Sequence, residues 1–209
     1  MTPPRTGRHD REHIVETALT LLDRVGLPDL TMRRLAAELD VQPSALYWHV
    51  RNKQELLAAV ADRILDRVRI PEAGQGDLQQ RLLATARGIR DALLAYRDGA
   101  EVVLSTEALR LGSSRALGAL ATVFRADCSP ADDARARIAA AAVLQFILGH
   151  TTLVQQQMHA ESHGAATPPA GVEPGPAPEE EGSPSSFEVF DAGVRMLARG
   201  FSLATDSRV

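Results

Sequence analysis

The stretch that decides the fold is LTMRRLAAELDVQPSALYWHVRNK, which occupies residues 30–53. Thr31 is a favourable N-cap, because its hydroxyl can accept a hydrogen bond from an unpaired N–H in the first turn of a helix. Leu35, Ala36 and Leu39 then recur at helical spacing and form one apolar face. This part of the stretch predicts a helix that begins just after Thr31 and buries one side.

A tight turn and a second, shorter helix are predicted next. Asp40 lies at the turn, where most residues resist a positive φ and where Gly, Asn and Asp tolerate it. Pro43 suits the first turn of the following helix, in which no N–H is required. We expect that helix to run from Pro43 to about Val50, with Leu46 and Val50 buried. The side chains left mostly outside are Ser44, Ala45, Tyr47, Trp48 and His49.

The outer face of this second helix suits the major groove of DNA. Small side chains at its start allow the backbone to approach base edges, and the methyl group of Ala45 can touch a thymine methyl. Arg33, in the preceding helix, has the length to reach a guanine edge, and Lys53 can reach a phosphate. A solvated or dimer-forming aromatic patch is the alternative interpretation. The residues predicted to contact DNA are Thr31, Arg33, Pro43, Ser44, Ala45, Tyr47, Trp48, His49 and Lys53.

Three segments resemble a known family: LYWHVRNKQELL at 46–57, YRDGAEVVL at 96–104 and GHTTL at 149–153. They are similar to the TetR family of one-component bacterial regulators, in particular its tetracycline repressor-like subgroup. The resemblance implies a homodimeric transcriptional regulator, in most cases a repressor that a small-molecule effector releases from a palindromic operator. Arg33 stands at the position where proteins of this subgroup have an arginine that contacts a guanine, so the resemblance implies the same role for Arg33. In that subgroup the run matching residues 43–45 contains a Gln that contacts an adenine. This chain has Pro43, Ser44 and Ala45 instead, so we expect its operator to differ at that base.

The composition favours a soluble all-α protein. The chain has 209 residues, of which 44% are hydrophobic, 24% charged and only 4% aromatic. No run of about 18 uncharged apolar residues is present, so no membrane span is expected. The N-terminus lacks the apolar core of a signal peptide, and the single Cys128 fits a reducing compartment, so we expect a cytoplasmic location.

The net charge of −4 is distributed unevenly along the chain. Residues 1–70 hold eleven Lys and Arg against ten Asp and Glu, whereas residues 71–209 hold twelve against seventeen. A slightly basic first part on an acidic body is expected of a dimer that touches DNA at one end.

Helix signals predict two domains. Residues 1–70 form a three-helix helix-turn-helix DNA-binding domain, with a fourth helix at 53–69 as its link to the rest. Residues 71–209 form a helical ligand-binding and dimerisation domain, with a mobile Pro- and Gly-rich loop at 160–185. Capping boxes are predicted at Asn52 with Glu55, Asp77 with Gln80, and Ser185 with Glu188. Further helices are predicted at about 10–25, 77–96, 99–107, after 114, from 129 to 159, and at 186–204.

The last predicted helix carries a strong apolar stripe at spacings of three and four. Its members are Phe187, Phe190, Val194, Leu197 and Phe201. We expect this helix and the one at 129–159 to pair with their copies in a four-helix dimer interface, as the resemblance implies. The alternative is that the stripe closes the core of a single chain.

The resemblance also implies an effector pocket in the second domain. Where the tetracycline repressor binds a magnesium–drug chelate with a His and a partner-chain Glu, this chain has Val103 and Met158. A magnesium–tetracycline chelate is therefore not expected, and a more apolar effector is. No metal site or cofactor is predicted, and ordinary core is the alternative at each position. The predicted pocket residues are Thr85, Ile89, Val103, Thr106, Leu117, Leu120 and His150.

Two other functions compete with a ligand-controlled regulator. An enzyme is not expected, because no Ser/His/Asp order, Gly-rich phosphate loop, Cys/His metal spacing or paired carboxylates occur in the sequence. A DNA-binding protein that responds to no ligand stays open. A small molecule that stabilises the dimer and also lowers operator affinity would distinguish the two.

Overall fold

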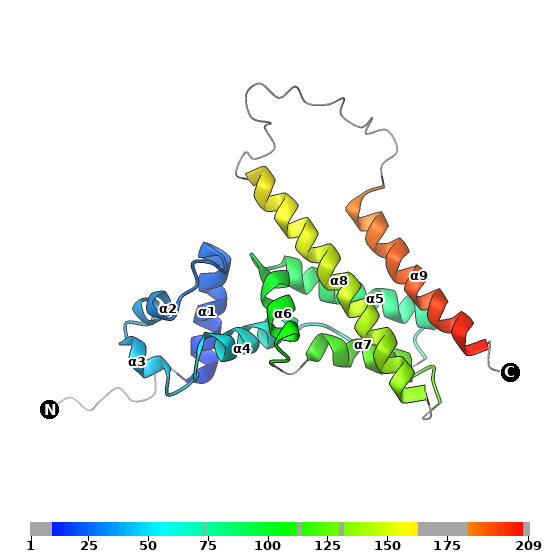
Figure 1. The fold of residues 1–209 in the computed structure, drawn as a ribbon, viewed down its shortest axis with the longest axis horizontal. Coiled ribbons are helices and arrows are strands. Elements are labelled where there is room, and N and C mark those ends of the chain that lie inside the picture. The colour runs from blue at the N-terminus through cyan, green and yellow to red at the C-terminus, as the bar shows by residue number, and fades with distance from the viewer. Residues whose placement is uncertain (1–9, 73, 113, 130–131, 163–183, 207–209) are drawn as a thin grey trace, which may run out of the picture. The chain divides into compact units, whose positions relative to one another are not determined.

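The computed structural model describes residues 10–72, 74–112, 114–129, 132–162 and 184–206 (Figure 1). Helices and turns account for this described part, in which no strand occurs, so the predicted all-α fold is confirmed. The helices are α1 (Arg11–Val25), α2 (Met32–Glu38), α3 (Pro43–Leu46), α4 (Lys53–Leu65), α5 (Leu78–Leu94), α6 (Gly99–Ala108), α7 (Arg115–Arg125), α8 (Asp133–Ser162) and α9 (Ser186–Asp206).

The described residues form two compact units. The first combines the residues up to Val68 with Asp91–Ala116, and the second combines Arg69–Arg90 with the residues from Leu117 onward. The domain boundary predicted near residue 70 stays a prediction. The compact units divide the chain differently, because the end of α5, all of α6 and the start of α7 belong with the helix-turn-helix.

N-cap side chains determine where α1 and α2 begin. Asp10 caps α1 by accepting a hydrogen bond from the His13 N–H at 2.8 Å. Thr31 caps α2 in the same way, accepting from the Arg34 N–H at 3.1 Å. Asp40 adopts a φ of +53° in the turn after α2, as predicted. These local interactions fix where α2 begins and where the chain turns toward α3.

The capping box predicted before α4 forms with one change. Asn52 Oδ1 accepts from the Glu55 N–H at 2.8 Å, as expected. The Glu55 carboxylate instead accepts from the Arg51 N–H at 2.9 Å and from Arg51 Nε at 3.0 Å, one residue earlier than predicted. These backbone and guanidinium donors lower the pKa of Glu55, so its negative charge is held at the N-terminus of α4, where the helix dipole favours it. α4 ends at Leu65, short of the predicted end at 69.

The capping boxes predicted before α5 and α9 are both confirmed. The Asp77 N–H donates to Gln80 Oε1 at 3.1 Å, and the Gln80 N–H donates to Asp77 Oδ1 at 2.8 Å. At α9, the Ser185 N–H donates to Glu188 Oε2 at 2.8 Å, and the Glu188 N–H donates to Ser185 Oγ at 3.2 Å. Both helices therefore begin where the sequence places them.

α8 and α9 run side by side in the second unit (Figure 1). Gly193 of α9 faces the Phe146 ring of α8, and a Cβ at Gly193 would lie 2.3 Å from a ring carbon. Phe190 is fully buried and its ring centroid lies 5.8 Å from that of Phe146. The close approach of the two helices thus depends on the missing side chain of Gly193.

The apolar stripe of α9 faces the interior of its own chain. Phe190 and Val194 are fully buried, and Phe201 packs against Phe124 of α7 with ring centroids 4.7 Å apart. This finding corrects the assignment of the whole stripe to a dimer interface, because its central residues already close the core of one chain. Phe187, at the start of the stripe, is half-exposed.

α8 is long and apolar enough to cross a membrane, by length and composition alone. The sequence had suggested no such segment, because α8 mixes small and polar residues with the apolar ones. α9 covers part of α8, and Ala140, Val143 and Ile147 are buried. We therefore interpret α8 as the core helix of the second unit. The predicted mobile loop lies mostly outside the described residues, since α8 continues to Ser162.

Candidate nucleic-acid interface

α2 and α3 share a small apolar core, to which α1 also contributes. Leu35 and Ala36 of α2, Leu46 of α3 and Val50 beyond it are all at most 1% exposed. The left-handed turn at Asp40 brings the two helices together. The predicted helix-turn-helix is therefore present in the first unit.

α3 is shorter than predicted, since it covers only Pro43–Leu46 and does not reach Val50. The N–H groups of His49 and Val50 still donate to the Leu46 carbonyl, at 2.9 and 3.0 Å. The chain therefore continues as a hydrogen-bonded turn after α3. This turn keeps Val50 inside and leaves the residues between it and Leu46 on the surface.

The surface of α3 and this turn carries large aromatic side chains in water. Trp48 is 89% exposed and Tyr47 is 51% exposed. Ser44 and His49 are also exposed, whereas Ala45 is half-buried. An exposed Trp gains almost nothing from folding, and grouped exposed aromatic residues mark binding surfaces. Six of the predicted DNA-contacting residues thus lie on one short segment, namely Pro43, Ser44, Ala45, Tyr47, Trp48 and His49.

Two adjacent arginines of α2 have different surroundings. The Arg34 guanidinium donates to the Asp29 carbonyl and pairs with the Asp29 carboxylate, in both cases at 3.3 Å. Arg33 is exposed beside it, and Lys53 is half-buried at the first position of α4. Thr31 uses its oxygen to cap α2, which leaves the hydroxyl proton to donate elsewhere. Arg34 therefore stabilises the loop before α2, while Arg33 is placed to extend outward.

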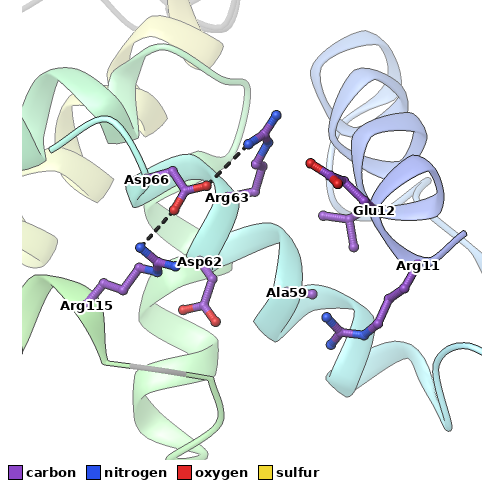
Figure 2. Close-up of a pocket in the computed structure, with 8 residues that line it drawn as sticks. Arg11, Glu12, Ala59, Asp62, Arg63, Asp66 and Arg115 are labelled. Atoms are coloured by element: carbon purple, nitrogen blue, oxygen red, sulfur yellow. Dashed lines mark hydrogen bonds and ion pairs between the residues drawn. The ribbon is translucent and has the colours of Figure 1, made fainter.

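A polar cavity of about 370 Å³ lies in the same unit, among α1, α4 and the start of α7 (Figure 2). Asp66 lies between Arg115, at 2.8 Å, and Arg63, at 3.2 Å. Arg63 also pairs with Glu16 of α1, so alternating charges link three helices. These side chains satisfy one another, and we assign the cavity a structural role. Its other lining residues are Arg11, Glu12, Val15, Ala59 and Asp62.

The residues predicted for an effector pocket are mostly core. Thr85, Ile89 and Leu120 are fully buried in the second unit, and Leu117 is half-buried there. Val103 and Thr106 are buried on α6 in the first unit. Their common membership of a pocket stays a prediction. The hydroxyls of Thr85 and Thr106 donate to carbonyls of their own helices, each at 2.9 Å, which reduces what they can offer a ligand.

His150 occupies a defined position beside the start of α9. Its Nε2 lies 3.1 Å from Ser186 Oγ, and its ring packs beside those of Phe146 and Phe190, at centroid distances of 6.0 and 5.1 Å. Burial, and after it the positive charge of Arg90, lower the pKa of His150. The neutral imidazole therefore links α8 to α9 through its hydrogen bond with Ser186.

One residue of structural consequence was missed in the sequence. Asp98, in the segment YRDGA, has a φ of +56°, is 8% exposed, and accepts a hydrogen bond from the Leu27 N–H at 2.7 Å. The Asp-Gly pair at 98–99 is a turn signal that could have located it. Its distant partner could not be found from local spacing.

The helix-turn-helix, with its exposed aromatic and basic residues, is typical of DNA-binding transcriptional regulators. Residues 14–60 match the family described as bacterial regulatory proteins, tetR family. Residues 70–178 match the tetracyclin repressor-like C-terminal domain. The chain belongs to the TetR family and is a DNA-binding transcriptional regulator.

Similar proteins span nearly the whole chain. Tetracycline repressor protein class C from Escherichia coli is 34% identical over 201 residues, which are 91% of this chain and 89% of that protein. The crystal structure of Mycobacterium smegmatis BioQ has a TM-score of 0.76 at 34% identity, covering 93% of this chain and 98% of BioQ. BioQ bound to its natural double-stranded DNA operator has a TM-score of 0.70 at 33% identity, covering 93% and 99%.

Proposed function

We propose that the protein is a homodimeric, cytoplasmic repressor that binds a near-palindromic operator and that a small-molecule effector releases it. The observation that carries the DNA-binding part is the exposure of Trp48 and Tyr47 on the segment after the left-handed turn. A dimer would present two such segments, so its operator should hold two half-sites about one helical turn apart. The similarity to BioQ, which was crystallised with its operator, supports this proposal.

The proposed contacts divide into two kinds. Arg33 contacts a base edge, and Pro43, Ser44 and Ala45 allow the backbone to approach the groove. Phosphate contacts come from the remaining predicted residues and fix the position on the duplex without specifying its sequence. These residues are Thr31, Tyr47, Trp48, His49 and Lys53.

The proposed dimer uses residues other than the buried stripe of α9. Met196 of α9 is 70% exposed and Ile138 of α8 is 71% exposed. Leu153, Met158 and Val189 are also large apolar residues with exposed side chains on these two helices. Burying them against a second copy would remove apolar surface from water, which favours association. The mass of the purified protein in solution tests this part of the proposal.

The proposed effector is not a magnesium–tetracycline chelate. Val103 and Met158 occupy the positions at which the tetracycline repressor has its metal-binding side chains. Neither Val nor Met offers the oxygen ligand that magnesium prefers. Thr85, Ile89, Leu117, Leu120 and the half-buried His150 support an apolar ligand. The alternative is a DNA-binding protein without an effector.

The test of DNA recognition compares three substitutions on an operator selected from random duplexes by the wild-type protein. Lys53→Ala should weaken binding to every duplex by a similar factor, since it removes a phosphate contact. Arg33→Ala should also reduce the preference for the selected operator over unrelated DNA. Arg34→Ala is the matched control, because it removes the same charge from a side chain engaged with Asp29. Full retention of affinity and preference by Arg33→Ala would refute its base-contacting role.

The test of the effector class uses tetracycline with excess Mg²⁺ as the probe. We expect the affinity of the wild-type protein for its selected operator to stay unchanged when the probe is added. Release of DNA at low probe concentration would refute the apolar-effector proposal. A small molecule that raises the melting temperature and lowers operator affinity would exclude the ligand-independent alternative.

A further inference from the structure

Two carboxylates join the loop after α1 to the turn before α6, within the first unit. Asp98 accepts from the Leu27 N–H at 2.7 Å. Asp23, in the last turns of α1, accepts from the Arg97 N–H at 3.0 Å. Each segment thus offers a carboxylate to a backbone N–H of the other. We call these two bonds the reciprocal clamp.

The backbone around the reciprocal clamp has little freedom. Asp98 has a φ of +56°, a left-handed conformation that Asp tolerates better than most residues with a Cβ. A Cβ on Gly26, whose φ is +81°, would lie 2.9 Å from Asp98 Oδ2. A Cβ on Gly99 would lie 2.4 Å from the Leu93 carbonyl oxygen. A side chain at either glycine would therefore displace the backbone or the carboxylate of the reciprocal clamp.

The loop held by the clamp leads directly into the DNA-contacting helices. Leu27 lies four positions before Thr31, the N-cap of α2, and Leu30 between them is 1% exposed. Because the loop is short and anchored by Leu30, the position of the Leu27 N–H constrains where α2 begins. Arg33 lies in the first turn of that helix.

The other side of the clamp leads into α6. Gly99, the first residue of α6, follows Asp98 directly, and the buried Val103 and Thr106 lie one and two turns further along. Asp98 is therefore one link between α6 and the loop before α2, beside the packing of α6 on α4. This route is separate from the covalent connection, which runs through α4 and α5.

We propose that Asp98 and Asp23 are positioning residues for operator recognition. The reciprocal clamp fixes α2 and α3 on the turn before α6 and thereby sets the separation of the two recognition segments in the dimer. This inference rests on the proposed function, since a separation matters only for a dimer on a two-part operator. The carboxylates contact no DNA in this role and act through the backbone that they hold.

The test measures operator spacing as well as affinity. Full-length variants are titrated against the duplex selected by the wild-type protein and against versions with one or two base pairs added or removed at its centre. Asp98→Ala and Asp23→Ala should each lower affinity for the selected spacing about tenfold, since each loses a hydrogen bond to a charged acceptor. They should also lose most of the preference for that spacing over the altered ones.

Two further variants make the result specific. Asp98→Asn keeps an oxygen that can accept from the Leu27 N–H, so it should recover much of the spacing preference. Glu38→Ala is the matched control, because Glu38 is a carboxylate that pairs with Arg24 and joins α1 to α2 without touching the turn before α6. It changes the net charge by the same amount and should keep the wild-type preference for spacing.

The outcomes separate this inference from the proposed function. If the wild-type protein selects no duplex, both fail together. If it selects a two-part operator and the Asp98→Ala and Asp23→Ala proteins match Glu38→Ala in affinity and spacing preference, the clamp proposal alone is refuted. Should Asp98→Ala not fold, as judged by its circular dichroism, Asp23→Ala and Asp98→Asn decide the question. Asp23→Ala keeps the bond from Leu27 to Asp98, and Asp98→Asn keeps the bond from Arg97 to Asp23 and an acceptor for the Leu27 N–H.

Discussion

The turn after α3 and the helix α9 both carry aromatic residues, but the turn exposes them and α9 buries most of them. Trp48, just after the four-residue α3, is 89% exposed. Phe190, in the 21-residue α9, is fully buried against Phe146 and His150. A short helix cannot cover a large ring with its own neighbours, whereas a long helix can dock along its whole length on another.

The difference in exposure distinguishes aromatic side chains that stabilise the fold from those that are exposed to a binding partner. Those of α9 hold one chain together, because their burial contributes to folding. Tyr47 and Trp48, after α3, contribute little to folding and are exposed to a partner, which we propose to be DNA. The four predictions below test this division, starting with the buried aromatic residue.

The largest effect is expected from Phe190→Ala. Phe190 is 0% exposed, and Arg90 lies over its ring at 4.7 Å. Its truncation leaves a cavity between α8 and α9, which should lower the free energy of unfolding by about 3–5 kcal/mol. Chemical denaturation followed by circular dichroism measures the change. Phe187→Ala, at a half-exposed position of the same helix, should cost clearly less, and equal losses would contradict the buried role of Phe190.

A smaller loss is expected from Thr31→Ala. The Thr31 hydroxyl caps α2 through the Arg34 N–H, and removing a threonine cap costs about 1 kcal/mol of the unfolding free energy. Thr31→Ser keeps the oxygen and should recover most of that loss. The same denaturation measurement applies. If Thr31→Ala and Thr31→Ser lost stability equally, the cap would not be what stabilises the start of α2.

The stability of the second unit should depend on pH through His150. Its pKa lies below the ordinary 6.5 in the folded chain, because of burial and Arg90, so the folded state takes up the proton less readily than the unfolded state. The stabilisation is therefore complete above pH 6.5 and is lost as the pH falls through the folded pKa. His150→Gln removes the titration. The difference in unfolding free energy between wild type and His150→Gln should shrink from pH 7.5 toward acid, and a constant difference would contradict the neutral state of His150.

Trp48→Ala should have the smallest effect on folding. With 89% of Trp48 in water, the free energy of unfolding should change by no more than about 0.5 kcal/mol. Binding to the selected operator should nevertheless weaken, which a fluorescence anisotropy titration can measure. A stability loss like that of Phe190→Ala would show that Trp48 belongs to the core and would remove the distinction between the two aromatic groups.

Local sequence predicted local structure well. Thr31, Asp40 and the boxes at Asp77 and Ser185 act through residues at most four positions away, so their spacing carries the information. The shortness of α3 was not predictable, because Tyr47 and Trp48 fit a helical pattern equally well.

Long-range partners could not be predicted in the same way. The periodicity of α9 shows which face is apolar, but it does not say whether α8 of the same chain or a second chain covers that face. The bond from Asp98 to Leu27 joins positions 71 residues apart, and no spacing rule connects them. The exposure of Tyr47 and Trp48 was predictable because it follows from local helix geometry, whereas the residues of an effector site depend on how several helices meet.

The long apolar α8 has a consequence for how the chain is made. On the ribosome, α8 is complete at Ser162, and the face that α9 will cover has no partner until α9, which ends at Asp206, has also been synthesised. The interval from Ser162 to Asp206 lasts about 2–9 s, since chains grow by roughly 5–20 residues per second. During that time the apolar face of α8 that α9 will cover is open to aggregation or to chaperones.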